Sequence, residues 1–267
     1  MTIAPAISCV IPVFNGKCYL QRAVNSILAQ RSDAQVVLVD DGSTDGSNEL
    51  VLQMARDDHR VLALVLPENR GQGNARNIGV AAANSPYVTF LDQDDEHIPG
   101  WYDYAVELLD SNKDYAAIKG GVELMDLPTE LRIEPTDPRL RAINNSVMWN
   151  VVMRKIVYQA LGGCLSSLRR GGEDIAFMSA INKHFPPVST DFPSTQHYVK
   201  PNGSTEAFLK RTRVVGATFE FLEINSVEVD GTLAKVLLDY QSQADINVSA
   251  LRALLSSTAA VSAERRQ

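Results

Sequence analysis

Four nearly continuous apolar segments limit the fold of this chain more than any other feature. They cover residues 7–14, 36–39, 61–66 and 87–91, and each begins fewer than thirty residues after the last. Strands that are apolar along their whole length are typical of parallel sheets covered by helices on both faces. The spacing leaves room for one helix between each pair of strands.

Helical stretches occupy those intervals, at residues 17–30, 45–56 and 73–83. Ser43 or Thr44 is expected to cap the second helix, since their hydroxyls accept hydrogen bonds from free backbone N–H groups. A regular β-α-β-α order predicts an α/β fold with a doubly wound, mostly parallel sheet.

The length and charge of the chain indicate its domain organisation and which binding partners are disfavoured. The chain has 267 residues, of which 45% are hydrophobic, so one large domain with or without a small appendage is expected. It has 25 basic and 32 acidic residues and a net charge of −7. This balance disfavours nucleic acid as a partner, because phosphate neutralisation needs a dense basic face.

Cysteine usage and hydropathy indicate a cytoplasmic protein. Cys9, Cys18 and Cys164 lack metal-ligand spacing and are interpreted as reduced structural thiols. No apolar run reaches membrane-spanning length, and the first residues lack a signal-peptide profile. We therefore expect no membrane span, with peripheral membrane association left open.

Polar and glycine-rich segments follow each predicted strand. They are residues 12–16 (PVFNG), 40–45 (DDGSTD), 69–79 (NRGQGNARNIG) and 90–96 (FLDQDDE). Ligands of such sheets bind outside the carboxyl ends of the strands, where these four segments would meet. Their convergence favours one nucleotide-phosphate site over four unrelated solvated turns. The glycines do not form the dinucleotide-binding pattern, so NAD binding is not supported.

The last of these segments carries four acidic residues, Asp92, Asp94, Asp95 and Glu96. Such a cluster either forms a solvated turn or shares a divalent cation with a phosphate, because the cation offsets the carboxylate repulsion. Taken alone, the stretch leaves both interpretations open.

Taken together, the motifs resemble family 2 glycosyltransferases. The matching segments are residues 11–15 (IPVFN), 39–45 (VDDGSTD), 69–79 and 92–95 (DQDD), all in the family's order within about the first hundred residues. The resemblance implies an inverting enzyme with a GT-A type α/β fold, in which a Rossmann-like nucleotide-binding half is followed by an acceptor-side half.

The resemblance also implies roles for individual residues. Phe14 would stack on the base, Asp41 would accept a hydrogen bond from uracil, and Asp94 and Asp95 would hold Mn²⁺ or Mg²⁺ with Asp92 adjacent. The full expected nucleotide-binding set is Pro12, Val13, Phe14, Asn15, Asp41, Gly71, Arg76, Asp92 and Asp94.

After residue 100 the sequence contains fewer of these motifs. We predict a helix at residues 101–109, a strand at 116–124, a long loop at 125–145, a strand at 146–153 and a helix at 154–161. Loops of that length are usually functional, so a lid or an acceptor-facing segment is expected there, although its arginines are better explained by a solvated loop face.

Glu173 and Asp174 open a further predicted helix. Acidic residues are favourable in a first helical turn, so capping alone explains them. The resemblance matches Asp174 to the family's general base, with Glu173 beside it in the catalytic pair. A cap and a base can coexist, and the helix N-terminus is expected to keep Asp174 ionised near neutrality.

Two segments near the end of the chain leave alternatives open. Residues 198–205 resemble the family's closing loop, with Lys200 where histidine is common and His197 nearby. Either side chain could contact the diphosphate or the metal, or simply lie on a surface loop. Residues 219–224 and Asp230-Gly231 predict a hairpin, and a helix follows from residue 233. This helix would pack on the domain or form a homodimer.

The expected organisation is a nucleotide-sugar-binding half at residues 1–112, an acceptor and catalytic-base half at 113–215, and a hairpin-and-helix appendage at 216–267. The expected function is metal-dependent inverting transfer from a nucleoside diphosphate sugar, in particular a UDP-sugar, to a hydroxyl of a glycan, lipid-linked or other acceptor. The alternatives are a sugar-phosphate nucleotidyltransferase and a non-catalytic nucleotide-sugar-binding protein.

Overall fold

The computed structural model describes residues 4–128, 131, 133–134, 137–168, 172–211, 242–245 and 247–249. Its elements in chain order are β1 (Ile7–Val13), α1 (Leu20–Leu28), β2 (Ala34–Asp40), α2 (Ser47–Asp57), β3 (Val61–Val65), α3 (Gln72–Ala82), β4 (Tyr87–Phe90), β5 (Glu96–His97), α4 (Trp101–Ser111), β6 (Ala117–Met125), α5 (Pro138–Ser146), β7 (Val151–Arg154), α6 (Lys155–Ala160), α7 (Glu173–His184), β8 (Val188–Tyr198) and α8 (Ser204–Arg211).

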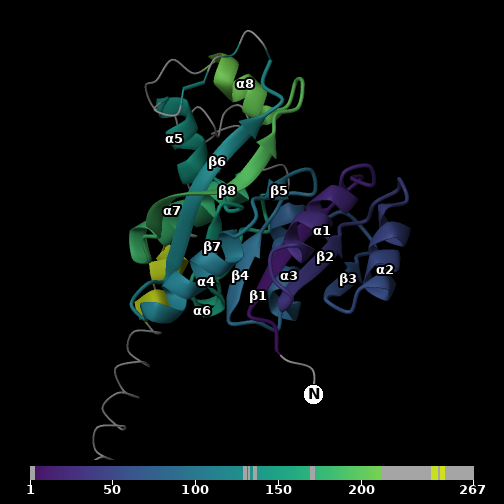
Figure 1. The fold of residues 1–267 in the computed structure, drawn as a ribbon, viewed down its shortest axis with the longest axis horizontal. Coiled ribbons are helices and arrows are strands. Elements are labelled where there is room, and N and C mark those ends of the chain that lie inside the picture. The colour runs from purple at the N-terminus through teal and green to yellow at the C-terminus, as the bar shows by residue number, and fades with distance from the viewer. Residues whose placement is uncertain are drawn as a thin grey trace, which may run out of the picture.

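The strands form one curved sheet in the order β3-β2-β1-β4-β7-β6-β8-β5 (Figure 1). Strands β1 to β4 pair in parallel, as do β6 and β8, whereas β7 and β5 run antiparallel to their neighbours. This mixed, mostly parallel sheet confirms the predicted α/β class. It runs without a break from the first half of the chain into the second.

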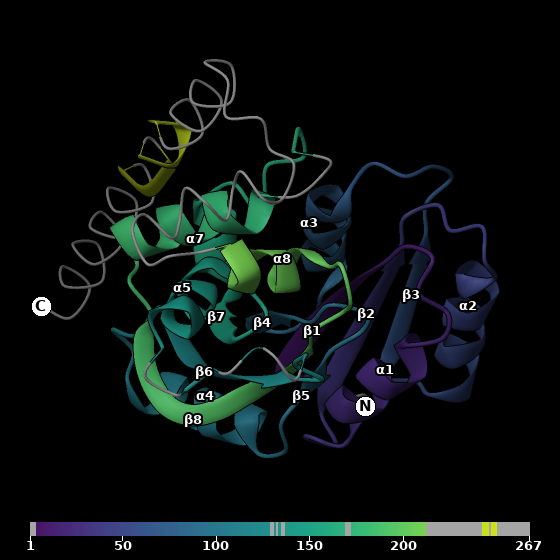
Figure 2. The ribbon, with the colours of Figure 1, turned by 90° about the horizontal axis from the view of Figure 1, so that it is seen from above.

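Helices cover both faces of the sheet. Alternate residues of a strand point to opposite faces, and β1 shows this with Val10 on one side and Cys9 on the other. Val10 belongs to a core closed by α3, α6 and α7, while Cys9 belongs to a core closed by α1, α2 and α4 (Figure 2). The sheet is therefore doubly wound, as predicted.

The start of α2 differs from the prediction. The cap position is Gly46, which adopts a left-handed φ of 89°, and neither Ser43 nor Thr44 caps the helix. Asp45 instead accepts hydrogen bonds from the N–H and the hydroxyl of Ser47. The loop before α2 therefore contacts both the start of α2 and the segment that follows β1, through Asp45 and through the Asn15 backbone and side chain.

The second half of the chain also corrects two predictions. The stretch 125–145 is not a loop throughout, because α5 begins at Pro138, where Asp137 accepts a hydrogen bond from the N–H of Arg139. An acidic cap followed by proline is a helix-start signal that was present in the sequence. The strand expected at 146–153 shortens to β7, since Ser146 still belongs to α5.

The C-terminal appendage falls mainly outside the described residues, and so do the predicted hairpin and most of the helix that follows it. None of the described helices has both the length and the apolar composition needed to cross a lipid bilayer.

Candidate functional site

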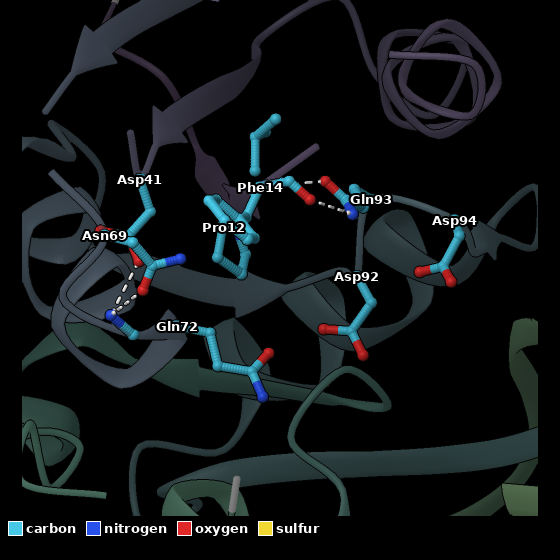
Figure 3. Close-up of a pocket in the computed structure, with 10 residues that line it drawn as sticks. Pro12, Phe14, Asp41, Asn69, Gln72, Asp92, Gln93 and Asp94 are labelled. Carbon is cyan, nitrogen blue, oxygen red and sulfur yellow. Dashed lines mark hydrogen bonds between the residues drawn. The ribbon is translucent and has the colours of Figure 1, made fainter. Parts of the chain in front are cut away.

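The segments that follow β1 to β4 surround a cavity of about 300 Å³ at the carboxyl edge of the sheet (Figure 3). Its volume lies at the lower end of the range for small-molecule sites. The cavity is lined by Pro12, Val13, Phe14, Asp41, Asn69, Gly71, Gln72, Asp92, Gln93 and Asp94. Most of the expected nucleotide-binding residues therefore do lie together.

Phe14 and Gln93 join β1 to the acidic loop. The backbone N–H of Phe14 donates to Gln93 Oε1 at 3.0 Å, and Gln93 Nε2 donates to the Phe14 carbonyl at 3.1 Å (Figure 3). The Phe14 side chain is 43% exposed, which leaves an aromatic face available for stacking at the cavity. Gln93 was not among the expected site residues, because its partner lies 79 residues away and no local pattern indicates the contact.

Asp41 forms another part of the cavity wall. Its carboxylate is buried and accepts hydrogen bonds from the backbone N–H groups of Arg70 (2.9 Å) and Gly71 (2.8 Å). Each carboxylate oxygen has a second lone pair, so the group can still accept from a ligand. Gly71 has a φ of 91°, a left-handed value that favours glycine and lets the loop turn onto Asp41.

Asn15 does not line the cavity. Its N–H donates to Ser43 Oγ at 3.0 Å, and its side-chain Oδ1 accepts from the Thr44 N–H at 2.9 Å. Asn15 thus holds the loop after β2 against the end of β1 and supports the site from outside.

Arg76 lies beneath the cavity and not on its surface. This buried guanidinium forms an ion pair with the buried Glu173 and donates to Asp92 Oδ1 at 2.9 Å. Burial alone lowers the pKa of Arg76, but the Glu173 and Asp92 carboxylates outweigh it and the pKa is raised. Arg76 is therefore a fixed cation that joins α3, the acidic loop and α7.

Asp95 faces away from the cavity, toward β8. It is fully buried, with Oδ2 at 2.8 Å from His197 Nδ1 and Oδ1 accepting from the Tyr198 N–H at 3.1 Å. Burial raises the pKa of Asp95 to about 6. His197 Nε2 lies 2.9 Å from Thr205 Oγ1, so both ring nitrogens of His197 have partners.

The positions of Asp92, Asp94 and Asp95 decide which carboxylates could hold the expected divalent cation. Within the described ranges, no group of three or more histidine, cysteine or acidic side chains could hold an ion. Asp92 and Asp94 do line the cavity, and Mg²⁺ is commonly bound by one or two carboxylates together with substrate phosphates. The residues fit a divalent cation on Asp94 that phosphate oxygens complete. Asp95 does not line the cavity and both its oxygens contact β8, so its expected part in the metal site stays a prediction.

A second cavity of about 100 Å³ adjoins the first. Gln72 and Asp92 line both. The remaining lining residues come from α5, α7, β8, α8 and the loops between elements, and they are Ile143, Val147, Trp149, Gly172, Asp174, His197, Ser204 and Thr205. The Trp149 and His197 rings stack with centroids 5.1 Å apart, which fixes this wall.

Asp174 is the expected base, and it lies in this second cavity as the second residue of α7. Its Oδ1 accepts a hydrogen bond from the Ile175 N–H at 2.8 Å. Burial first, and the neighbouring Glu173 carboxylate second, raise the pKa of Asp174 to about 7. Burial and the Glu173 charge thus oppose the helix N-terminus that was expected to keep Asp174 ionised near neutrality, and its role as the base stays a prediction. A pKa near 7 suits a general base.

The protein is thus a doubly wound α/β protein with a cavity at the strand ends and a smaller adjoining cavity that holds the Asp174 carboxylate. The family model for glycosyl transferase family 2 matches residues 8–154, more than half of the chain. The chain belongs to that family, as the motif resemblance predicted.

Relatives agree with this assignment. An uncharacterized glycosyltransferase of Haemophilus influenzae is 44% identical over 92 residues, covering 34% of this chain and 37% of the relative. The putative teichuronic acid biosynthesis glycosyltransferase TuaG of Bacillus subtilis is 37% identical over 93 residues, with coverage of 34% and 37%. The alignments with these two relatives span little more than a third of their length.

Solved structures show the same fold. The structure of S. aureus TarS 1–349 in complex with UDP-GlcNAc superposes with a TM-score of 0.61 at 17% identity, covering 89% of this chain and 72% of that one. TarS 1–349 in complex with UDP gives the same TM-score at 18% identity, with coverage of 87% and 69%. The fold is therefore of the GT-A type.

Proposed function

We propose that this protein transfers a sugar from a nucleoside diphosphate sugar to an acceptor hydroxyl, with inversion at the anomeric carbon. One observation carries the proposal: the cavity at the strand ends and the cavity that holds Asp174 share Gln72 and Asp92 as lining residues. A donor lying across this junction would place its nucleotide beside Phe14 and its sugar near Asp174. The UDP and UDP-GlcNAc complexes of TarS support a uridine nucleotide as the donor.

The roles of the residues follow from their positions. Phe14 supplies an aromatic face for the base, a contact worth about 1–3 kcal/mol, and Asp41 accepts a hydrogen bond from its edge. Asp174 takes the proton of the acceptor hydroxyl. As the acceptor oxygen bonds to the anomeric carbon, the bond from that carbon to the diphosphate oxygen breaks on the opposite face, and this single displacement inverts the configuration.

The leaving diphosphate carries negative charge away from the sugar. A divalent cation bound to Asp94 and the donor phosphates would act as a Lewis acid and neutralise that charge. Asp92 lies beside Asp94 in the cavity, and Arg76 holds the Asp92 carboxylate in place through a hydrogen bond of 2.9 Å.

The acceptor is proposed to be a hydroxyl of a glycan or of a lipid-linked glycan. Support comes from the relative TuaG, a putative teichuronic acid biosynthesis glycosyltransferase. The second cavity agrees with a sugar ring, because it combines the apolar side chains of Ile143 and Val147 with the hydroxyls of Ser204 and Thr205.

The test is a screen of nucleoside diphosphate sugars with glycan acceptors, read out as release of the nucleoside diphosphate. Release by the wild type that depends on both substrates is expected. Consumption of a nucleoside triphosphate with pyrophosphate release would instead indicate a nucleotidyltransferase. Tight UDP binding with no turnover of any donor would indicate a nucleotide-sugar-binding protein.

A further inference from the structure

Lys200 places a positive charge at the rim of the donor cavity. It lies in the short loop between β8 and α8, where its ammonium forms an ion pair with Asp94 Oδ2. The same Nζ lies 4.4 Å from the centre of the Tyr19 ring, a cation–π distance. Asp94 lines the donor cavity, so this cation lies next to the space where a diphosphate would bind.

The segment that carries Lys200 is anchored to the acidic loop by several further contacts. The Tyr198 hydroxyl donates to Glu96 Oε1 at 2.6 Å, and the Tyr198 N–H donates to Asp95. Arg22 Nε lies 3.2 Å from Glu96 Oε1, and its guanidinium lies 3.7 Å from the centre of the Tyr198 ring. The backbone that leads to Lys200 is therefore held in place before any ligand arrives.

The charge of the cavity leaves a role for this ammonium. Asp41, Asp92 and Asp94 line the cavity, and no lysine or arginine is among its described lining residues. A diphosphate brings further negative charge into this acidic site. Arg76 is already shared between Asp92 and Glu173, whereas the Lys200 ammonium at this rim has Asp94 as its ion-pair partner.

Lys200 and a divalent cation would compete for the same carboxylate. Asp94 lines the donor cavity and Asp95 does not, so Asp94 is the carboxylate that both cations would contact there. Charged hydrogen bonds to phosphate oxygens are stronger than neutral ones, and an ammonium can turn its three N–H donors from a carboxylate to a phosphate.

We propose that Lys200 binds the diphosphate of the donor directly, so that nucleotide binding by this protein persists without a divalent metal. The inference rests on the proposed function, since it assumes that the cavity takes a nucleoside diphosphate. Lys200 supplies part of the charge neutralisation that a metal on Asp94 would otherwise provide alone.

Isothermal titration calorimetry with UDP in EDTA tests this. Wild type should bind UDP, and Lys200→Met should bind it about 10- to 100-fold more weakly, as expected for the loss of a charged hydrogen bond. Lys200→Arg should stay close to wild type. Added Mg²⁺ or Mn²⁺ should improve the affinity of Lys200→Met more than that of wild type. Uridine, which has no phosphates, should bind wild type and Lys200→Met equally.

The matched control is Lys113→Met, an exposed lysine outside both cavities, which should bind UDP as wild type does. Equal UDP affinity of wild type and Lys200→Met in EDTA would overturn the inference, as would wild-type binding that requires metal. Either result leaves the proposed function standing. Failure of wild type to bind UDP with and without metal would overturn both. Equal weakening of uridine binding would indicate a collapsed loop and would also overturn the inference.

Discussion

Arg76 and Glu173 form a buried ion pair between residues that lie 97 positions apart in the chain. Arg76 belongs to α3, next to the donor cavity, and Glu173 is the first residue of the helix that carries Asp174. Because Arg76 also holds Asp92, one guanidinium fixes a carboxylate of each half of the site. We therefore expect Glu173 to act through position and charge, and Asp174 to be the acid of the pair that receives a proton.

We predict that Glu173→Ala destabilises the protein by about 3–5 kcal/mol, because it removes one partner from a buried ion pair and leaves the other charge uncompensated. Urea unfolding monitored by circular dichroism measures the loss. The control is Lys113→Ala, whose exposed pair with Asp110 should contribute only about 0–1 kcal/mol. Losses of similar size in the two variants would contradict a structural role for the Arg76–Glu173 pair.

The sequence predicted the rim of the site because parallel strands bring their carboxyl ends to one edge. Phe14, Asp41 and Asp94 line the same cavity for that reason. The sequence did not predict which group each of the side chains contacts. Asp95 follows Asp94 directly, yet it points to β8, since the loop turns with the Asp95 N–H bonded to the Asp92 carbonyl at 3.1 Å. Spacing along a loop does not fix such directions, whereas spacing along a strand does.

Asp41→Ala should weaken UDP binding by roughly 1–3 kcal/mol, because the Arg70 N–H and the base each lose an acceptor, and the Gly71 N–H keeps only its bond to Asn69 Oδ1. The melting temperature should fall as well. Asp41→Asn keeps one oxygen acceptor and should lie between wild type and alanine in both measurements. Calorimetry that finds wild-type UDP affinity in Asp41→Ala would exclude Asp41 from the donor site.

Gln93→Ala should weaken UDP binding by about 0.5–1.5 kcal/mol for each of the two hydrogen bonds that hold the Phe14 backbone. Gln93→Glu should behave similarly, since a carboxylate cannot donate to the Phe14 carbonyl. A matched control is Gln53→Ala on α2, where the glutamine contacts only its own helix. Equal UDP affinity in the Gln93 and Gln53 variants would show that Phe14 needs no such support.

Asp174 should set the pH dependence of transfer. Because burial and Glu173 raise its pKa to about 7, the group is mostly protonated below neutrality and cannot act as a base there. The rate should rise with pH through about 7 and then level off. Glu173→Gln removes a like charge beside Asp174 and should move that midpoint to lower pH, since Arg76 then acts on Asp174 with less competition. A midpoint unaffected by Glu173→Gln would assign the titration to another group.

Asp174→Asn separates catalysis from helix capping, because the two roles predict opposite changes in stability. A folded-state pKa of about 7, against an ordinary 3.8, means that folding favours the protonated form. The stability from this group is complete below about pH 4, falls as pH rises, and is lost above about pH 7. Asparagine stays neutral throughout, so Asp174→Asn should match wild type in melting temperature at pH 4 and exceed it at pH 8.

Transfer by Asp174→Asn should fall by about 10²–10⁴-fold with UDP affinity nearly unchanged. A helix cap without a catalytic role would instead give a lower melting temperature at pH 8 and near-normal transfer.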